Sequence, residues 1–247
     1  MVKIPEGKEL LRAGLHFGHR TPKWDPKMKP FIFGVKNGVH IFDLDKTVES
    51  LTKSLELVKA IVAKGGTMMF LGTKKQARNI IEKYATESGM PYVVERWIGG
   101  TITNFQEIYK LIKKLDSLEE MALQNDYEKK YTKKERALFA EERERLLKMI
   151  GGIRMIKKVP DLVFIVGVKE EKNATQEAKV KKVKTLGIVD TNTDPDDVDY
   201  QIYANDDAVK SIELITRLVA EAVKEGKEEA AKAVAEAQPV KALKKEE

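Results

Sequence analysis

Apolar positions in the first hundred residues alternate between the spacings of helices and strands. Steps of four, three and four from Leu51 through Leu55 and Val58 to Val62 predict an amphipathic helix over 47–64, ended by a glycine pair. Short apolar runs predict strands at 39–44, 67–71 and 92–94. A short helix is expected within 9–18 and another up to about residue 87. This rhythm predicts a parallel sheet with helices on its faces.

The same alternation resumes after residue 160. The run 161–166 is almost continuously apolar, as in a strand buried on both faces. Helices are predicted at 175–182 and 206–224, and extended segments at 183–190 and 200–203. Lys181, Lys182 and Lys184 displace apolar residues near the start of the 183–190 strand. We therefore expect that strand to be short or at the edge of the sheet, with its lysines offering an additional phosphate contact.

Between these two halves the apolar spacing changes to that of a coiled coil. Alternating steps of three and four give the first seam, which is Ile108, Leu111, Leu115, Leu118 and Ala122. A polar stretch at 125–130 interrupts it, and the T-x-x-E sequence from Thr132 to Glu135 fits the capping box that begins a new helix. The second seam is Phe139, Leu146, Met149 and Ile153. Together the two helices predict a hairpin that projects from the body.

The predicted fold class is α/β, with a layered parallel sheet of the flavodoxin or Rossmann kind, helices on both faces and an inserted coiled-coil hairpin. The globular domain is discontinuous, comprising residues 1–103 and 154–225, and the hairpin occupies 104–153. Residues 226–247 are rich in Lys, Glu and Ala and predict a charged, flexible tail.

Composition narrows the functional classes. The chain has 247 residues, 42% of them hydrophobic, without an apolar run of membrane-spanning length, so we expect a soluble protein without a membrane partner. The start lacks an apolar signal core, which predicts a cytoplasmic location. Cysteine is absent, which excludes disulfides and thiolate chemistry. A net charge of +6 favours a polyanionic partner, although 39 acidic residues accompany the 45 basic ones.

The stretch 14–47 combines residue types that a core does not need. Pro22, Pro26 and Pro30 recur every four residues, so we expect an extended segment without regular structure. The basic and aromatic side chains around them suit phosphate contact and base stacking. A solvated loop whose aromatics enter the core fits the same composition. The candidate RNA-binding residues are Arg20, Lys23, Trp24, Lys27, Lys29, Phe31 and Lys36.

Two shorter motifs add further candidates. The sequence GTKK at Gly72–Lys75 lies where a strand passes into a helix, a place where free backbone donors favour anions. With Arg78 one turn later, it predicts a phosphate contact by Lys74 and Lys75, although an ordinary turn explains the motif equally well. In RWIGG, at Arg96–Gly100, Trp97 is expected to pack where the hairpin meets the body, and Arg96 to reach RNA.

These motifs, in this order and with VDTNTDP at Val189–Pro195, resemble the family of the second protein of the bacterial small ribosomal subunit. The resemblance extends from about Leu10 to Lys224. It implies a structural constituent, not an enzyme, that binds 16S ribosomal RNA, supports translation and joins late in assembly, near the junction of head and body. The implied partners are neighbouring small-subunit proteins, including the large mRNA-binding first protein, with no small-molecule substrate.

An alternative function comes from DLDKT at Asp43–Thr47. It fits the D-x-D-x-T signature of magnesium-dependent haloacid-dehalogenase-like phosphatases, with Asp43 as nucleophile and Asp45 as acid and base. A helix cap at Asp45 or Thr47 explains the same residues. The proline-rich stretch and the hairpin have no role in such an enzyme.

A metal site is the second alternative. His19, Asp190, Asp206 and Asp207 are expected to converge at the carboxyl edge of the sheet, where α/β proteins place their sites. One imidazole and several carboxylates suit structural zinc or magnesium. Otherwise Asp190 and Asp206 cap a turn and a helix, and His19 contacts RNA or backbone. The ribosomal function requires no cofactor.

Overall fold

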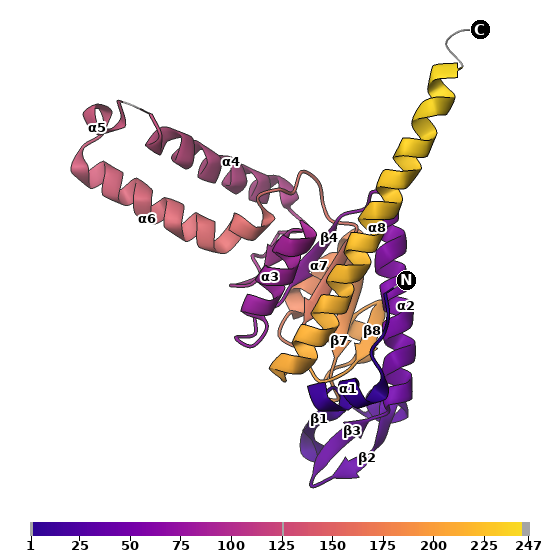
Figure 1. Ribbon diagram of the computed structural model, residues 1–247. Coiled ribbons are helices and arrows are strands. Elements are labelled where there is room, and N and C mark those ends of the chain that lie inside the picture. Colours follow the sequence, from indigo (N-terminus) through magenta and orange to yellow (C-terminus); the bar gives the residue numbers. More distant parts are fainter. Residues whose placement is uncertain (1, 125, 244–247) are drawn as a thin grey trace.

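A five-stranded parallel sheet forms the centre of the molecule (Figure 1). The computed structural model describes residues 2–124 and 126–243. The strands lie in the order β5-β4-β6-β7-β8, which confirms the predicted α/β fold. Their bounds are β4 (Met68–Leu71), β5 (Tyr92–Val93), β6 (Leu162–Val166), β7 (Lys184–Val189) and β8 (Tyr200–Tyr203).

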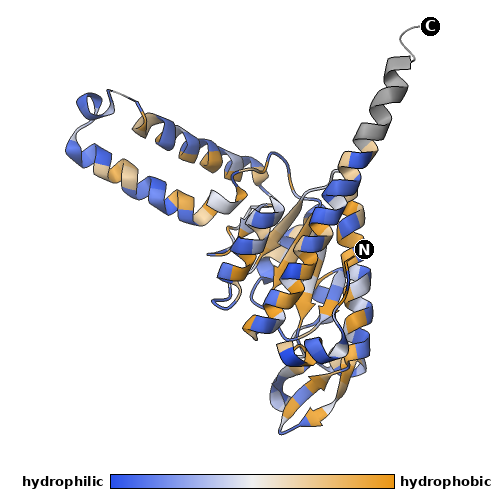
Figure 2. Cartoon of the chain, in the orientation of Figure 1, coloured by the Kyte–Doolittle hydropathy of each residue, from blue (hydrophilic) through white to orange (hydrophobic). Residues whose placement is uncertain are grey.

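Alternating side chains of this sheet enter two separate apolar layers. Phe70 and Phe164 pack edge to face in one layer, and their neighbours Met69 and Val163 enter the other. The first layer is covered by α2 (Leu44–Ala63), α3 (Arg78–Ser88) and α8 (Val209–Leu243), and the second by α7 (Lys172–Lys181). Since β4 and β6 are buried at every residue, they are continuously apolar, as Figure 2 shows.

The amphipathic helix predicted from the four-three-four spacing is confirmed as α2. Its buried residues against α8 and the sheet include Leu51, Leu55, Val58 and Val62. The short helix α1 (Gly7–Ala13) ends at Gly14, whose left-handed φ of 77° forms the C-cap. No helix within the described residues is both long and apolar enough to cross a bilayer.

A separate antiparallel sheet, in the order β1-β3-β2, is formed by the stretch 17–42. Its strands are β1 (Phe17–Arg20), β2 (Ile32–Lys36) and β3 (Val39–Phe42), of which the sequence predicted only the last and placed it with the parallel strands. Asn37 and Gly38 form the β2–β3 turn with φ of 53° and 74°, so the predicted turn is confirmed.

The proline-rich segment is not extended, and that expectation was wrong. It forms two 3-10 turns, Thr21–Lys23 and Pro26–Phe31, each with proline at its first or second position. Proline already has the φ of a helical start, and the Asp25 side chain accepts a bond of 2.9 Å from the Lys27 N–H. The same residues that exclude a long helix therefore favour single turns.

The prediction that the strand before Asp190 is short or at an edge was also wrong. β7 has six residues, lies between β6 and β8, and is buried from Thr185 onwards. Lys181 belongs to α7, Lys182 caps it, and Lys184 only begins the strand, so the lysines leave the apolar part intact. At Gly187 a Cβ atom would lie 2.4 Å from Val168, which explains the glycine in this strand.

The inserted segment forms two helices that lie against each other and extend away from the body (Figure 1). They are α4 (Phe105–Ala122) and α6 (Lys133–Ile150), joined through the single turn α5 (Tyr127–Lys130). The capping box of Thr132 and Glu135 is confirmed. Ile112, instead of the predicted Leu111, is buried beside Leu115, while Leu146 and Ile150 are buried in α6. The coiled-coil geometry of the pair stays a prediction.

The helix α8 does not end at Gly226 as its composition suggested. A Cβ at Gly226 would lie 2.8 Å from the Lys59 carbonyl, so this glycine lets α8 pass close to α2. The helix continues to Leu243. Residues 244–247 of the predicted tail lie outside the described residues, and the division into three domains stays a prediction.

A single carboxylate, that of Glu177 on α7, holds the loop from which the hairpin extends. Its Oε1 accepts bonds from the Trp97 Nε1 and the Gly100 N–H, both 2.9 Å long. Its Oε2 accepts the N–H groups of Ile102 and Thr103 and the Thr103 hydroxyl, each at 3.0 Å. Partial burial alone would raise the pKa of Glu177, but the hydrogen bonds that its carboxylate accepts outweigh burial, so the pKa is lowered. Trp97 thus packs at the hairpin root, as predicted.

We expect Glu177→Gln to destabilise the protein by about 2–3 kcal/mol near neutral pH, because a neutral amide accepts these bonds less well and brings its own N–H groups towards donors. The folded pKa of Glu177 is lowered, so its contribution is present above the ordinary carboxyl pKa and disappears as pH falls through the folded value. Urea unfolding should therefore show the difference from wild type shrinking in acid. The exposed Glu56→Gln variant is the control, expected within about 0.5 kcal/mol of wild type at both pH values. A constant difference across pH would contradict this role.

Candidate nucleic-acid interface

The predicted basic arm is here defined as residues 20–36. Arg20, Lys23, Lys29 and Lys36 are exposed, and no ion pair joins them to another residue in the described part of the chain. Because β1 and the two 3-10 turns fix the backbone, these cations project from a structured segment and not from a loose loop. Each is free to approach an external anion.

Lys27 behaves differently, because it fastens the arm to the loop after β7. Its Nζ lies 2.7 Å from Asp194 and 2.6 Å from Asp196, and these carboxylates raise its pKa. The Asp25 N–H donates to the Thr191 carbonyl at 2.7 Å. The arm is thus bonded to the VDTNTDP motif, and the main role of Lys27 is to hold the arm in position.

The two aromatic residues of the arm pack on the protein itself. The Phe31 ring stacks on Tyr203 with centroids 3.6 Å apart, and Trp24 lies 5.1 Å from the ring of His40. Both are partly buried. Base stacking by these rings stays a prediction. Phe31 packs against the core, as the alternative reading of the sequence allowed, whereas Trp24 packs on His40.

His19 and three aspartates converge at the carboxyl edge of the parallel sheet, as predicted. The His19 Nδ1 lies 3.0 Å from Asp190 and its Nε2 lies 3.3 Å from Asp207, and the bond with Asp190 raises the pKa of the imidazole. Donor atoms of His19, Asp206 and Asp207 lie within 4.8 Å of one another. β1 approaches this edge closely, because a Cβ at Gly18 would lie 2.5 Å from Thr191.

Lys74 provides the positive charge within this acidic cluster. Its Nζ lies 2.8 Å from Asp206 and 2.9 Å from Asp207, with Glu170 at 3.7 Å. Asp206 is only 1% exposed, and burial together with repulsion from Asp190 raises its pKa to about 7 in spite of Lys74. Since the side chain of Lys74 is only 11% exposed, its predicted phosphate contact would compete with these carboxylates.

The rest of the GTKK turn is also occupied from within. The Thr73 N–H donates to Glu171 at 3.3 Å and the Thr73 hydroxyl donates to the same carboxylate, whose pKa is raised by burial. Arg78 pairs with Glu95 at 3.1 Å. Lys75 and Arg96 are exposed and have no ion pair within the described ranges. A protein carboxylate therefore fills the position where an external anion was expected.

DLDKT proves to be a helix start. The Asp43 Oδ1 accepts the Asp45 N–H at 3.1 Å and caps α2, a role that the sequence had given to Asp45 or Thr47. Thr47 is buried, and its hydroxyl donates a hydrogen bond to the Tyr203 carbonyl at 2.7 Å. Asp43 follows β3 of the antiparallel sheet, whereas Asp206 follows β8 of the parallel sheet. Likewise Asn205, not Asp206, caps the turn into α8, through bonds of 2.8 and 2.9 Å.

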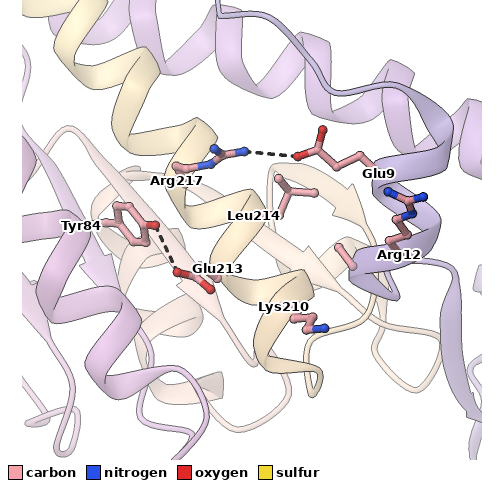
Figure 3. A pocket seen from close by; sticks show the side chains of 8 residues that line it. Glu9, Arg12, Tyr84, Lys210, Glu213, Leu214 and Arg217 are labelled. Carbon is pink, nitrogen blue, oxygen red and sulfur yellow. Dashed lines mark hydrogen bonds and ion pairs between the residues drawn. The ribbon is translucent and has the colours of Figure 1, made fainter.

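Two residues that organise these sites were not foreseen. Glu171 precedes the polar helix α7 and Glu177 lies within it, neither in a recognisable motif, and only the partners described above reveal what they do. A hollow of about 380 Å³ between α1, α3 and α8 was also unforeseen (Figure 3). Across it Glu9 lies 3.7 Å from Arg217, and Glu213 accepts a hydrogen bond from the Tyr84 hydroxyl at 3.4 Å. No predicted site residue lines it.

Comparison with known proteins identifies similar chains. The sequence profile of the family described as Ribosomal protein S2 matches residues 10–226. Small ribosomal subunit protein uS2 of Bifidobacterium adolescentis is 47% identical over 243 residues, covering 96% of this chain and 89% of that protein. The protein of the same name from Desulfatibacillum aliphaticivorans is 49% identical over 231 residues, covering 94% and 78%. That of Chlorobium chlorochromatii is 48% identical, covering 87% and 86%.

The acidic cluster generates a stability prediction. At pH 8.5, above the pKa of about 7 that Asp206 has in the folded protein, Lys74→Met should destabilise the protein by about 3–5 kcal/mol, because it leaves the buried Asp206 carboxylate without its cation. Adding Asp206→Asn should restore a large part of that loss, since the uncompensated charge is then removed. Urea unfolding of the single and double variants measures both effects, with the exposed neighbour Lys75→Met as control. Equal losses in the single and double variants would show that an uncompensated Asp206 carboxylate is not the cause of the loss.

Proposed function

The chain belongs to the ribosomal protein S2 family of the small ribosomal subunit, and we propose that it binds 16S ribosomal RNA directly through the basic arm. The observation that carries this proposal is the set of exposed, unpaired cations on a backbone fixed at both ends. A positively charged, preorganised segment neutralises phosphates without a large cost of ordering.

The RNA-facing residues in this proposal are the predicted cations that have no ion pair with the described residues. They are Arg20, Lys23, Lys29, Lys36, Lys75 and Arg96. Lys27, Lys74 and Arg78 are paired with carboxylates, and Trp24 and Phe31 pack on neighbouring rings, so we assign them mainly to holding the site in shape.

The family is one of structural ribosomal proteins and not of enzymes. The phosphatase alternative has no support, since the Asp43 carboxylate caps α2 and the relatives are named ribosomal proteins. We further propose that the chain joins the small subunit late in assembly and contacts neighbouring proteins there, among them the large mRNA-binding first protein. The resemblance alone supports these last two points.

A second proposal is that a divalent cation, zinc or magnesium, binds between His19, Asp206 and Asp207. The specific observation in its favour is that three donors, from β1 and the loop between β8 and α8, lie within 4.8 Å of one another. One imidazole with carboxylates is a donor set that zinc accepts. Lys74 contacts the Oδ1 atom of each aspartate, so it shares these ligands with the cation.

For the basic arm, we expect the triple variant Arg20→Gln, Lys23→Gln and Lys29→Gln to bind a 16S ribosomal RNA transcript at least about tenfold more weakly at physiological salt. The slope of log affinity against log salt should fall by about 2–3, since each lost phosphate contact removes about 0.9. The matched control is Lys3→Gln, Lys8→Gln and Lys210→Gln, which removes equal charge from exposed positions outside the arm. Filter binding over a salt series measures both variants, and equal losses would contradict a contact specific to the arm.

For the metal proposal, we expect the dialysed, folded chain to retain about one zinc or magnesium ion, measured by mass spectrometry of the intact and the acid-digested protein. His19→Ala should abolish retention, because it removes the imidazole ligand. His16→Ala, which alters a histidine outside the cluster, should leave it unchanged. Metal content near zero, or content insensitive to His19→Ala, rules out the site.

A further inference from the structure

A second group of unpaired cations lies at the opposite, amino edge of the parallel sheet. Lys64, Lys181, Lys182 and Lys184 are all exposed, and none makes an ion pair with the residues that the structure describes. They belong to the segments that enter strands β4 and β7, which lie on either side of β6. Because the strands are parallel, their amino ends meet at one edge, and the lysines gather there although they are distant in sequence.

These lysines line a groove of about 730 Å³. Asp161 is the one acid among the described residues lining it, and it is already occupied by Lys158 at 3.1 Å and by the Thr67 N–H at 2.8 Å. The remaining wall includes apolar side chains, among them Ile61 and Val159. A concave surface with excess positive charge and apolar walls suits a phosphate backbone whose riboses lie against protein.

Helix ends account for part of this charge. Lys64 caps the C-terminus of α2, and Lys181 and Lys182 lie at that of α7, where cations stabilise the helix dipole. This explanation does not extend to Lys184, which begins a strand. The helix-dipole explanation also predicts that replacing these lysines changes only the stability of the fold. A role in RNA binding predicts a change in affinity as well.

Lys182 adds an independent observation. Its φ of 56° and ψ of 33° place it in the left-handed region, which glycine or asparagine occupies at lower cost at the end of a helix. At Gly14 and Gly89 the chain uses glycine in the same capping position. A lysine at a position where the backbone favours glycine is consistent with a use of its charge outside the fold.

We propose that this amino edge is a second RNA-binding surface, on which Lys64, Lys181, Lys182 and Lys184 contact phosphates of 16S ribosomal RNA. The inference rests on the proposed function, since it assigns a further surface to the same ligand. The basic arm meets the parallel sheet through the loop after β7, at the carboxyl edge, so the two surfaces engage separate parts of the RNA.

The test compares Lys181→Gln/Lys182→Gln/Lys184→Gln with the charge-matched control Lys3→Gln/Lys8→Gln/Lys210→Gln in the full chain. Filter binding to a 16S ribosomal RNA transcript should show the edge variant at least about tenfold weaker at physiological salt, with a salt slope reduced by about 2–3. The control should keep the wild-type slope. Lys182→Gly alone should bind more weakly while its Tm rises by about 2–4 °C, because the strain is relieved.

The alternative outcomes lead to different conclusions. If the edge variant matches the control in affinity and slope while the arm variant is weakened, this inference is overturned and the proposed function stands. If the wild-type chain does not prefer the transcript to unrelated RNA, the proposed function fails as well. If the edge variant binds naked RNA normally but no longer sediments with small subunits, the groove receives an acidic protein segment, which overturns the assignment to RNA.

Discussion

The ammonium group of Lys74 is the charge on which the carboxyl edge of the sheet depends. It lies among Asp206, Asp207 and Glu170, and Asp190 is close enough to raise the pKa of Asp206. Without a cation at this point, buried carboxylates from several segments would repel each other in a medium of low polarity. Because β1 is joined to the same aspartates through His19, the position of the antiparallel sheet also depends on this balance.

Charge is therefore distributed unequally between the two ends of one sheet. At the carboxyl edge, several acidic side chains lie close together, and the nearby cations Lys27 and Lys74 form ion pairs with them. At the amino edge, Lys64, Lys181, Lys182 and Lys184 have no ion pair with the described residues, and the one acid among the described residues that line their groove, Asp161, is already occupied. A net charge of +6 shows none of this, because it averages over both ends. What an anionic partner meets is the local excess of free cations, so position decides more than total charge.

The elements that the sequence predicted correctly are those whose signal is local. Continuous apolar runs predicted β4 and β6, and helical spacing predicted α2 within a few residues. The mistakes arose where a tertiary contact decided the outcome. Gly226 resembled a helix stop but serves a close approach to α2, and three lysines resembled an edge strand but precede the buried part of β7. Among site residues, the convergence of Asp190 with Asp206 followed from topology, because carboxyl ends of parallel strands share an edge. The approach of His19 did not, since it lies on β1 of the antiparallel sheet. The pairing of Lys27 and the clamp by Glu177 did not, since nothing within either segment identifies a partner so distant in sequence.

Acids and bases thus have separate tasks in this molecule. Glu171 and Glu177 accept donors from loops that lack a regular ladder of backbone bonds, and so they fix the turn after β4 and the root of the hairpin. Those loops would otherwise carry unpaired N–H groups or move, and a mobile surface must be ordered before it binds. With the backbone held by carboxylates, the exposed cations are presented from rigid supports, and less ordering is required when a polyanion arrives. The 39 acidic residues of a basic protein are therefore compatible with an anionic partner, because those that bind loops from within do not face it.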